Sequence, residues 1–225
     1  MSDCRRAAAR RTVACFLLAF IAVADPIRAY AIDAPEGTIR WTIWREGLKV
    51  GRQTMIVHHA GAKLLIDNEI DITVRRINVY VTHRYVLRAK ETWTDGKLVE
   101  LAAIVNNDDE SAGVDATRTP SGFIVDGDGG HFEAPSNLVP STLWHIDMTK
   151  SDAVLDVETG KLLSVKSSVG AEVPLPVNGR DVPARHVSIS GDTTRELWYG
   201  PDGVLVRAQF DGLDGVPLDF RVDPR

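Results

Sequence analysis

Residues 91–101 read ETWTDGKLVEL, and this stretch decides the fold class. A run containing Trp93 leads into Asp95-Gly96, and an alternation of apolar and polar residues begins at Leu98 on the other side. An Asp-Gly pair tolerates the positive φ angles that a two-residue hairpin turn needs at both central positions. The stretch therefore predicts two antiparallel strands joined by a tight turn at Asp95-Gly96.

Similar stretches occur elsewhere in the chain. Residues 196–210 (ELWYGPDGVLVRAQF) again run from Glu through Trp to Asp-Gly and an alternating strand, and residues 157–165 (VETGKLLSV) repeat the turn without tryptophan. Period-two alternation is typical of strands with one face toward a core. It predicts strands at about 39–44, 51–59, 70–75, 79–93, 98–106, 113–119, 122–126, 153–158, 162–173, 184–190, 194–199, 204–210 and 217–222.

These patterns predict an all-β protein, with residues 32–225 as a single β domain. We expect a single large, curved antiparallel meander, an open or half barrel, with at most one short helix. Helical periodicity is weak beyond residue 31, and residues 140–149 are the best candidate for the helix. Polar turn-forming residues crowd positions 106–136, where we expect mobile loops around two short strands.

The N-terminal segment has the three parts of a secretory signal peptide. Four arginines, the last of them Arg11, precede the apolar run TVACFLLAFIAVA at 12–24, and Ala29-Tyr30-Ala31 supplies a cleavage site. The apolar run is shorter than the roughly 20 residues that a membrane-spanning helix needs. We therefore predict that residues 1–31 are removed and that the protein is exported.

Export changes both the charge and the chemistry of the chain. The net charge is −5, and removal of five arginines and two aspartates with residues 1–31 makes it about −8. Such an acidic surface repels phosphate backbones, so no nucleic-acid partner is expected. Cys4 and Cys15 both lie in the removed segment, which excludes disulfides and thiolate chemistry from the mature protein. We predict no cofactor.

The chain resembles an uncharacterised family of exported proteins of Gram-negative bacteria, a domain of unknown function. The resemblance rests on the motifs WREGLKVG (44–51), ETWTDGKL (91–98), PSTLWH (140–145), TGKL (159–162), GDTTRELWY (191–199) and PDGVLV (201–206). It implies a location in the periplasm. The family is also distantly similar to the curved β-sheets of periplasmic lipoprotein carriers, which implies a concave face that holds acyl chains.

Motifs for catalysis and for metal binding are weak. The sequence has no G-x-S-x-G and no H-E-x-x-H, and we assign no catalytic residue and no metal ligand. Asp126 and Asp128, in the glycine-rich DGDGG, are weak calcium candidates because the acid that closes an EF-hand loop is replaced by Asn137. His145 is expected to cap the turn of the short helix.

The tryptophans are the best candidates for binding. In one interpretation they pack in the core and pin the register of the strands. In the other, a curved sheet turns some of them toward a cavity for an apolar ligand, with Trp41, Trp93, Trp144 and Trp198 lining it. Both alternatives stay open at the level of the sequence.

We therefore expect a periplasmic, non-enzymatic protein that binds a lipidic or other apolar ligand in the concave face. Two alternatives belong to other classes. One is a hydrolase of an envelope polymer that uses loop acids and a histidine, His131 or His145, from residues 106–147. The other is a structural module whose edge strand or apolar patch binds another envelope protein.

Overall fold

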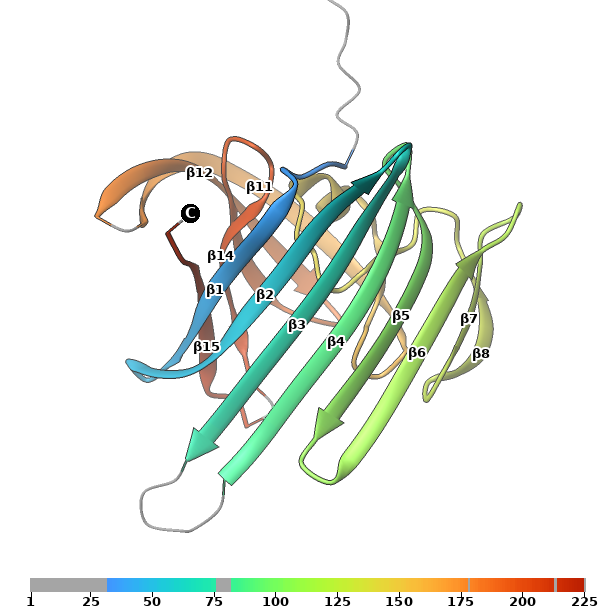
Figure 1. Cartoon of the computed structure of the whole chain (residues 1–225), viewed down its shortest axis with the longest axis horizontal. Coiled ribbons are helices and arrows are strands. Elements are labelled where there is room, and N and C mark those ends of the chain that lie inside the picture. The colour runs from blue at the N-terminus through green and yellow to red at the C-terminus, as the bar shows by residue number, and fades with distance from the viewer. Residues whose placement is uncertain (1–31, 76–81, 178, 213, 225) are drawn as a thin grey trace, which may run out of the picture.

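The computed structural model describes residues 32–75, 82–177, 179–212 and 214–224, which form one strongly curved sheet (Figure 1). The segment expected to be the signal peptide, residues 1–31, lies outside the described residues. The sheet has fifteen strands: β1 (Gly37–Arg45), β2 (Leu48–Ala60), β3 (Lys63–Arg75), β4 (Thr82–Thr94), β5 (Lys97–Asn107), β6 (Glu110–Arg118), β7 (Phe123–Gly127), β8 (Gly130–Ala134), β9 (Val139–Pro140), β10 (Ala153–Leu155), β11 (Leu162–Val177), β12 (Arg180–Gly191), β13 (Arg195–Tyr199), β14 (Leu205–Asp211) and β15 (Pro217–Val222).

The first and last strands meet at the centre of the sheet. β1 pairs with β15 in a register that runs from Trp41 opposite Val222 to Arg45 opposite Leu218. On one side of this pair the chain meanders outward from β2 to β8, and on the other side β14 to β9 complete the order. All neighbours are antiparallel except β9 and β10. The sheet ends at β8 and β9 without closing, which confirms the all-β open meander.

The hairpin turns have the backbone geometry that their sequences predict. Asp95 and Gly96 have φ angles of 51° and 69°, and Glu46 and Gly47 have φ angles of 50° and 78°. Positive φ at both central residues matches the right-handed twist of the flanking strands. Beside each of these turns the pairing shifts by one residue, between Ile43 and Trp44 in the first hairpin and between Thr92 and Trp93 in the other. Beyond each shift the strands pair in a continuous antiparallel register.

The concave side of the sheet is filled by the chain itself. Inward residues such as Trp41 and Ile43 of β1 and Met55 of β2 are fully buried in one apolar cluster. The segment between β8 and β11 contributes Leu138, Leu143, Trp144, Met148 and Leu155 to the same cluster. A fully buried side chain of this size contributes about 1.5–3 kcal/mol to stability. The returning segment thus forms the interior of the open barrel.

Residues 106–136 differ from the expectation of mobile loops. They contain β6, β7 and β8; β6 pairs with β5 from Glu110 to Thr117 and with β7 from Val114 to Arg118. The polar runs NNDDES and DGDGG lie in the tight turns between strands, where Asp108 has a φ of 54°. β6 and β7 correspond to the strands predicted at 113–119 and 122–126, whereas β8 was not predicted.

The helical content is small, as expected. The helix is a 3-10 turn, η1 (Ile146–Lys150), which overlaps only the end of the candidate segment 140–149. No helix among the described residues is long and apolar enough to span a membrane.

Candidate functional site

The four tryptophans proposed to line a ligand site are divided between the two faces of the sheet. Trp41, Trp93 and Trp144 are at most 1% exposed and belong to the core. Trp93 and Trp144 meet edge to face, with ring centroids 5.9 Å apart. The indole of Trp41 donates to the Leu205 carbonyl at 3.2 Å. Trp198 lies on the outer face. Of the four rings, only those of Trp93 and Trp144 are in direct contact among the described residues.

A buried carboxylate joins the two central tryptophans. Glu91 on β4 is 2% exposed, and its Oε2 accepts hydrogen bonds from Nε1 of Trp93 and Nε1 of Trp144, both at 2.8 Å. Its Oε1 accepts from the Thr142 hydroxyl at 2.7 Å. Burial raises the pKa of the Glu91 carboxyl above its ordinary value, although these three hydrogen bonds act in the opposite direction. Glu91 therefore anchors the returning segment to the concave face.

A small cavity of about 50 Å³ lies beside this anchor on the concave side. Its polar wall includes Gln53 of β2, whose Nε2 donates to Oδ1 of Asn68 on β3 at 2.9 Å. Arg195 of β13 also lines it, donates from Nη1 to the Ser141 carbonyl at 2.7 Å, and lies 4.9 Å from the centre of the Phe210 ring. Nδ2 of Asn68 and Nε of Arg195 are buried and have no hydrogen-bond partner among the described residues.

On the outer face, side chains stack across five strands. We call this set the outer ladder. His186 stacks on Trp198 with centroids 4.9 Å apart, the Arg207 guanidinium lies 5.0 Å from the Trp198 ring, and the Arg221 guanidinium lies 5.6 Å from the Trp44 ring. Cross-strand register supplies the contacts, since His186 pairs with Trp198, Trp198 with Arg207, Arg207 with Arg221, and Trp44 with Asp219. The outer ladder comprises His186, Trp198, Arg207, Asp219, Arg221 and Trp44.

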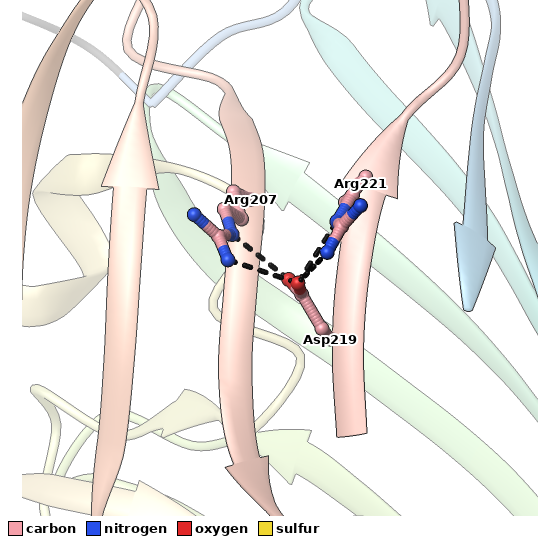
Figure 2. Close-up of polar contacts among 3 residues, drawn as sticks. All are labelled: Arg207, Asp219 and Arg221. Atoms are coloured by element: carbon pink, nitrogen blue, oxygen red, sulfur yellow. Dashed lines mark hydrogen bonds and ion pairs between the residues drawn. The ribbon is translucent and has the colours of Figure 1, made fainter. Parts of the chain in front are cut away.

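Asp219 fixes the two arginines of the outer ladder (Figure 2). Nε and Nη2 of Arg207 donate to its two oxygens at 2.8 and 2.9 Å, and Nε of Arg221 donates to Oδ2 at 2.8 Å. Burial would raise the pKa of Asp219, but the hydrogen bonds and charges of Arg207 and Arg221 outweigh it and hold that pKa below its ordinary value. Paired fork contacts of this kind set the orientation of both guanidinium groups.

A groove of about 470 Å³ runs beside these arginines. One wall is the outer face of β1, β14 and β15, with Trp44, Arg207 and Arg221; the other is the end of β11, with Leu175 and Val177. Figure 1 shows the β11–β12 hairpin curving past the C-terminal end of the chain, and a second small apolar cluster of Leu175, Ala184 and Val206 attaches this hairpin to β14. The volume lies within the range of about 300–1,000 Å³ that is usual for small-molecule sites.

The charges of this groove are nearly balanced. Asp223 lines it and accepts a hydrogen bond from the Thr42 hydroxyl at 2.8 Å. Asp219 is ion-paired with both guanidinium groups, and Asp223 is a second carboxylate in the lining of the groove. The groove presents fixed donors, acceptors and an indole face without a large excess of either charge.

His145 has the structural role that the sequence predicts. It is the N-cap of η1, where its Nδ1 accepts from the backbone N–H of Asp147 at 3.2 Å. Burial lowers the pKa of His145, although the charge of Asp147 acts in the opposite direction. Its ring lies against Gly203 in the turn before β14, and its backbone forms a bridge to Val204. His145 therefore joins η1 to the turn that precedes β14.

Gly203→Ala is expected to destabilise the protein more than Gly215→Ala. Both glycines have nearly the same φ, 75° and 74°. A methyl group at Gly203 would lie 2.6 Å from Nε2 of His145, whereas one at Gly215 would have no described atom within 4 Å. Each substitution carries the left-handed backbone cost of about 1–2 kcal/mol, and the clash adds about 1 kcal/mol at Gly203. Urea unfolding measures the difference; equal losses would contradict a tight contact with His145.

The other polar candidates do not converge. Asp126 and Asp128 are exposed near the β7–β8 turn, and no group of three or more His, Cys, Asp or Glu side chains suited to a metal ion occurs in the described part of the chain. His131 is exposed, with Nδ1 4.0 Å from Asp126. His145 is buried at η1. The structure thus places the two histidines of the hydrolase alternative in different settings, one exposed in β8 and one buried.

A serine, a histidine and a glutamate do meet on the outer face, in an order that differs from a nucleophilic triad. Oε2 of Glu196 contacts Nε2 of His186 at 2.5 Å and accepts from the Ser188 hydroxyl at 2.7 Å. In a triad the histidine lies between the serine and the acid and removes the serine proton. Here the acid lies between the other two, so this geometry does not activate Ser188.

Several of these residues were missed from the sequence. Glu91 was noticed only as the start of a hairpin motif, and Asp219 and Arg221 only as part of an alternating strand. Asp219 and Arg221 are two positions apart in β15 and therefore share a face, which was an available signal. The pairing of Arg207 with them depends on the register of β14 against β15.

The open fifteen-strand sheet defines a β-barrel-like protein of the all-β class. The chain belongs to the family described as Domain of unknown function (DUF6134), whose model matches residues 41–223. Its structure is similar to the crystal structure of a beta-barrel-like protein of domain of unknown function DUF1849 from Brucella abortus, with a TM-score of 0.59 and 10% sequence identity over 82% of this chain and 94% of that one. At this identity the likeness concerns the fold alone. No curated protein matches the chain.

Proposed function

We propose that this protein is an exported, non-enzymatic binding protein of the periplasm and that its ligand occupies the groove between β11 and the outer ladder. The groove carries the proposal, because Trp44 and the two guanidinium groups held by Asp219 line about 470 Å³ of space. The signal-peptide pattern of residues 1–31 supports export.

The chemistry of the groove favours a small amphipathic ligand. Leu175, Val177 and Trp44 offer apolar contacts, while Arg207 and Arg221 offer oriented N–H groups. Because the guanidinium charges are balanced by Asp219 and Asp223, a ligand without a large net charge fits best. This proposal keeps the lipidic or apolar ligand expected from the sequence and moves it from the concave face to the outer face, since the cavity described on the concave side has only about 50 Å³.

Native mass spectrometry of protein purified from the envelope of its native host tests the proposal. We expect a bound small molecule on the wild type, and its occupancy should fall about tenfold in Trp44→Ala and in Arg221→Ala, the loss expected when one good contact is removed. Arg88→Ala is the matched control, because Arg88 and Arg221 are both ion-paired outer arginines with side chains 62% and 56% exposed.

Two results would contradict the proposal that a ligand binds in the groove. One is wild-type protein that carries no small molecule at all. The other is a ligand retained at full occupancy by both Trp44→Ala and Arg221→Ala, which would instead favour the concave face as the binding site.

A further inference from the structure

We infer that the cavity on the concave side is a second, separate site, which binds the carboxylate of a small monocarboxylic acid through Asn68 and Arg195. This inference is independent of the groove proposed above, because the two sites share no lining residue.

The first argument is the pair of buried donors that line the cavity. Asn68 is 3% exposed, and its Oδ1 accepts a hydrogen bond from Nε2 of Gln53. This leaves Nδ2 of Asn68 without a hydrogen-bond partner in the described ranges, and the same is true of Nε of Arg195. A buried donor without an acceptor costs about 1–3 kcal/mol, so two of them around one cavity indicate an occupant that accepts hydrogen bonds.

The second argument is the charge of Arg195. Its Nη1 donates to the Ser141 carbonyl at 2.7 Å, and its guanidinium carbon lies 4.9 Å from the centre of the Phe210 ring. Neither contact uses the Nε–H group, which can therefore donate to a bound molecule. The acid that opposes it in the lining is Glu158. Burial, and then the nearby Asp156 carboxylate, raise the pKa of Glu158 and so weaken its competition for Arg195. An anionic acceptor is favoured over a neutral one.

The third argument is the size and lining of the cavity. About 50 Å³ holds a few water-sized groups, which is enough for a carboxylate with a short alkyl chain. Leu197, Leu205 and Phe220 line the cavity and supply apolar contacts for such a chain. The cavity is not fully enclosed, and Ile70, Glu158 and Phe210 in its lining are partly exposed.

Isothermal titration calorimetry with acetate, butyrate and octanoate tests the inference. We expect butyrate to bind more tightly than acetate because its methylene groups enter the apolar part of the cavity. Octanoate should gain little beyond butyrate, since the rest of its chain reaches solvent. Butanamide, which has the same chain without the charge, should bind at least about tenfold more weakly than butyrate.

Two variants assign the binding to this cavity. Arg195→Lys keeps the positive charge but removes Nε, and it should weaken butyrate about tenfold; Arg88→Lys, on the outer face, should leave the affinity unchanged. Glu158→Gln removes the competing carboxylate, and it should tighten butyrate several-fold. A purely structural role of Glu158 would not produce tighter binding, so this variant separates the site from a general loss of folding.

The inference fails if wild-type protein releases no heat with any of the three acids, or if a crystal soaked in butyrate shows only water between Asn68 and Arg195. It also fails if Arg195→Lys and Glu158→Gln both bind butyrate with wild-type affinity. None of these results bears on the groove, because Arg195 and Glu158 line the cavity and do not line the groove. Conversely, Trp44→Ala and Arg221→Ala test the groove and leave the lining of the cavity intact.

Discussion

Glu91→Ala is expected to lower the free energy of unfolding by about 3–5 kcal/mol, the largest effect of any single substitution proposed for this protein. The substitution leaves the indole N–H groups of Trp93 and Trp144 and the Thr142 hydroxyl without their acceptor in a fully buried site. It also opens a void where the carboxylate was. Urea unfolding followed by tryptophan fluorescence measures the loss.

Glu91→Gln is the matched control. Its amide oxygen can accept from both indole groups, and its amide nitrogen can donate to the Thr142 hydroxyl, so we expect a loss of no more than about 1 kcal/mol. If Glu91→Gln destabilised the protein as much as Glu91→Ala, the anchor would depend on the negative charge, and the hydrogen-bonding explanation would be wrong.

The pH dependence of the free energy of unfolding should also differ between the wild type and Glu91→Gln. Burial raises the pKa of Glu91 in the folded state, so the folded protein holds its proton to a higher pH than the unfolded chain does. The stability of the wild type should therefore fall as the pH rises from the ordinary glutamate pKa through the raised folded value. Glu91→Gln does not titrate and should lack this fall, which a comparison of unfolding curves across that range would reveal.

The sequence predicts the sheet well because the decisive signals are local. Alternation and the Asp95-Gly96 turn act within a few residues, and each places a side chain on one face or reverses the chain. The same rule explains why β8 was missed within residues 106–136, since this five-residue strand (GHFEA) has little alternation and follows a polar turn. Composition there favoured a loop, while pairing with β7 stabilises the strand.

The sites are harder to predict because their contacts are distant in sequence. Alternation places Trp41 and Trp44 on opposite faces, as the sequence indicated. However, Thr142 and Trp144 reach Glu91 across 51 and 53 residues, and no local pattern predicts that the segment after β8 returns through the concave face. The result is that the aromatic residues proposed as a cavity lining occur largely in a filled core, with a carboxylate at its centre.

Asp219→Ala is expected to lower the free energy of unfolding by about 3 kcal/mol. Arg207 and Arg221 are directly opposite each other on β14 and β15, and Asp219 is the carboxylate that both of them contact. Without it, two like charges face each other across neighbouring strands, which is destabilising. Asp214→Ala is the control, because Asp214 also pairs with an arginine, Arg45, but at a more exposed position where a much smaller loss is expected.

At acidic pH, the difference in the free energy of unfolding between the wild type and Asp219→Ala should become much smaller. The pKa of Asp219 is below its ordinary value of 3.8 in the folded state, so its contribution is present above that pH and is lost as the pH falls through the folded pKa. Wild type and Asp219→Ala should therefore converge in stability below about pH 3.8, and a gap that stays constant would contradict the ion-pair explanation.

Because Asp219 also orients both guanidinium groups at the groove, Asp219→Ala should reduce the occupancy of the co-purifying ligand at neutral pH, whereas Asp214→Ala should not.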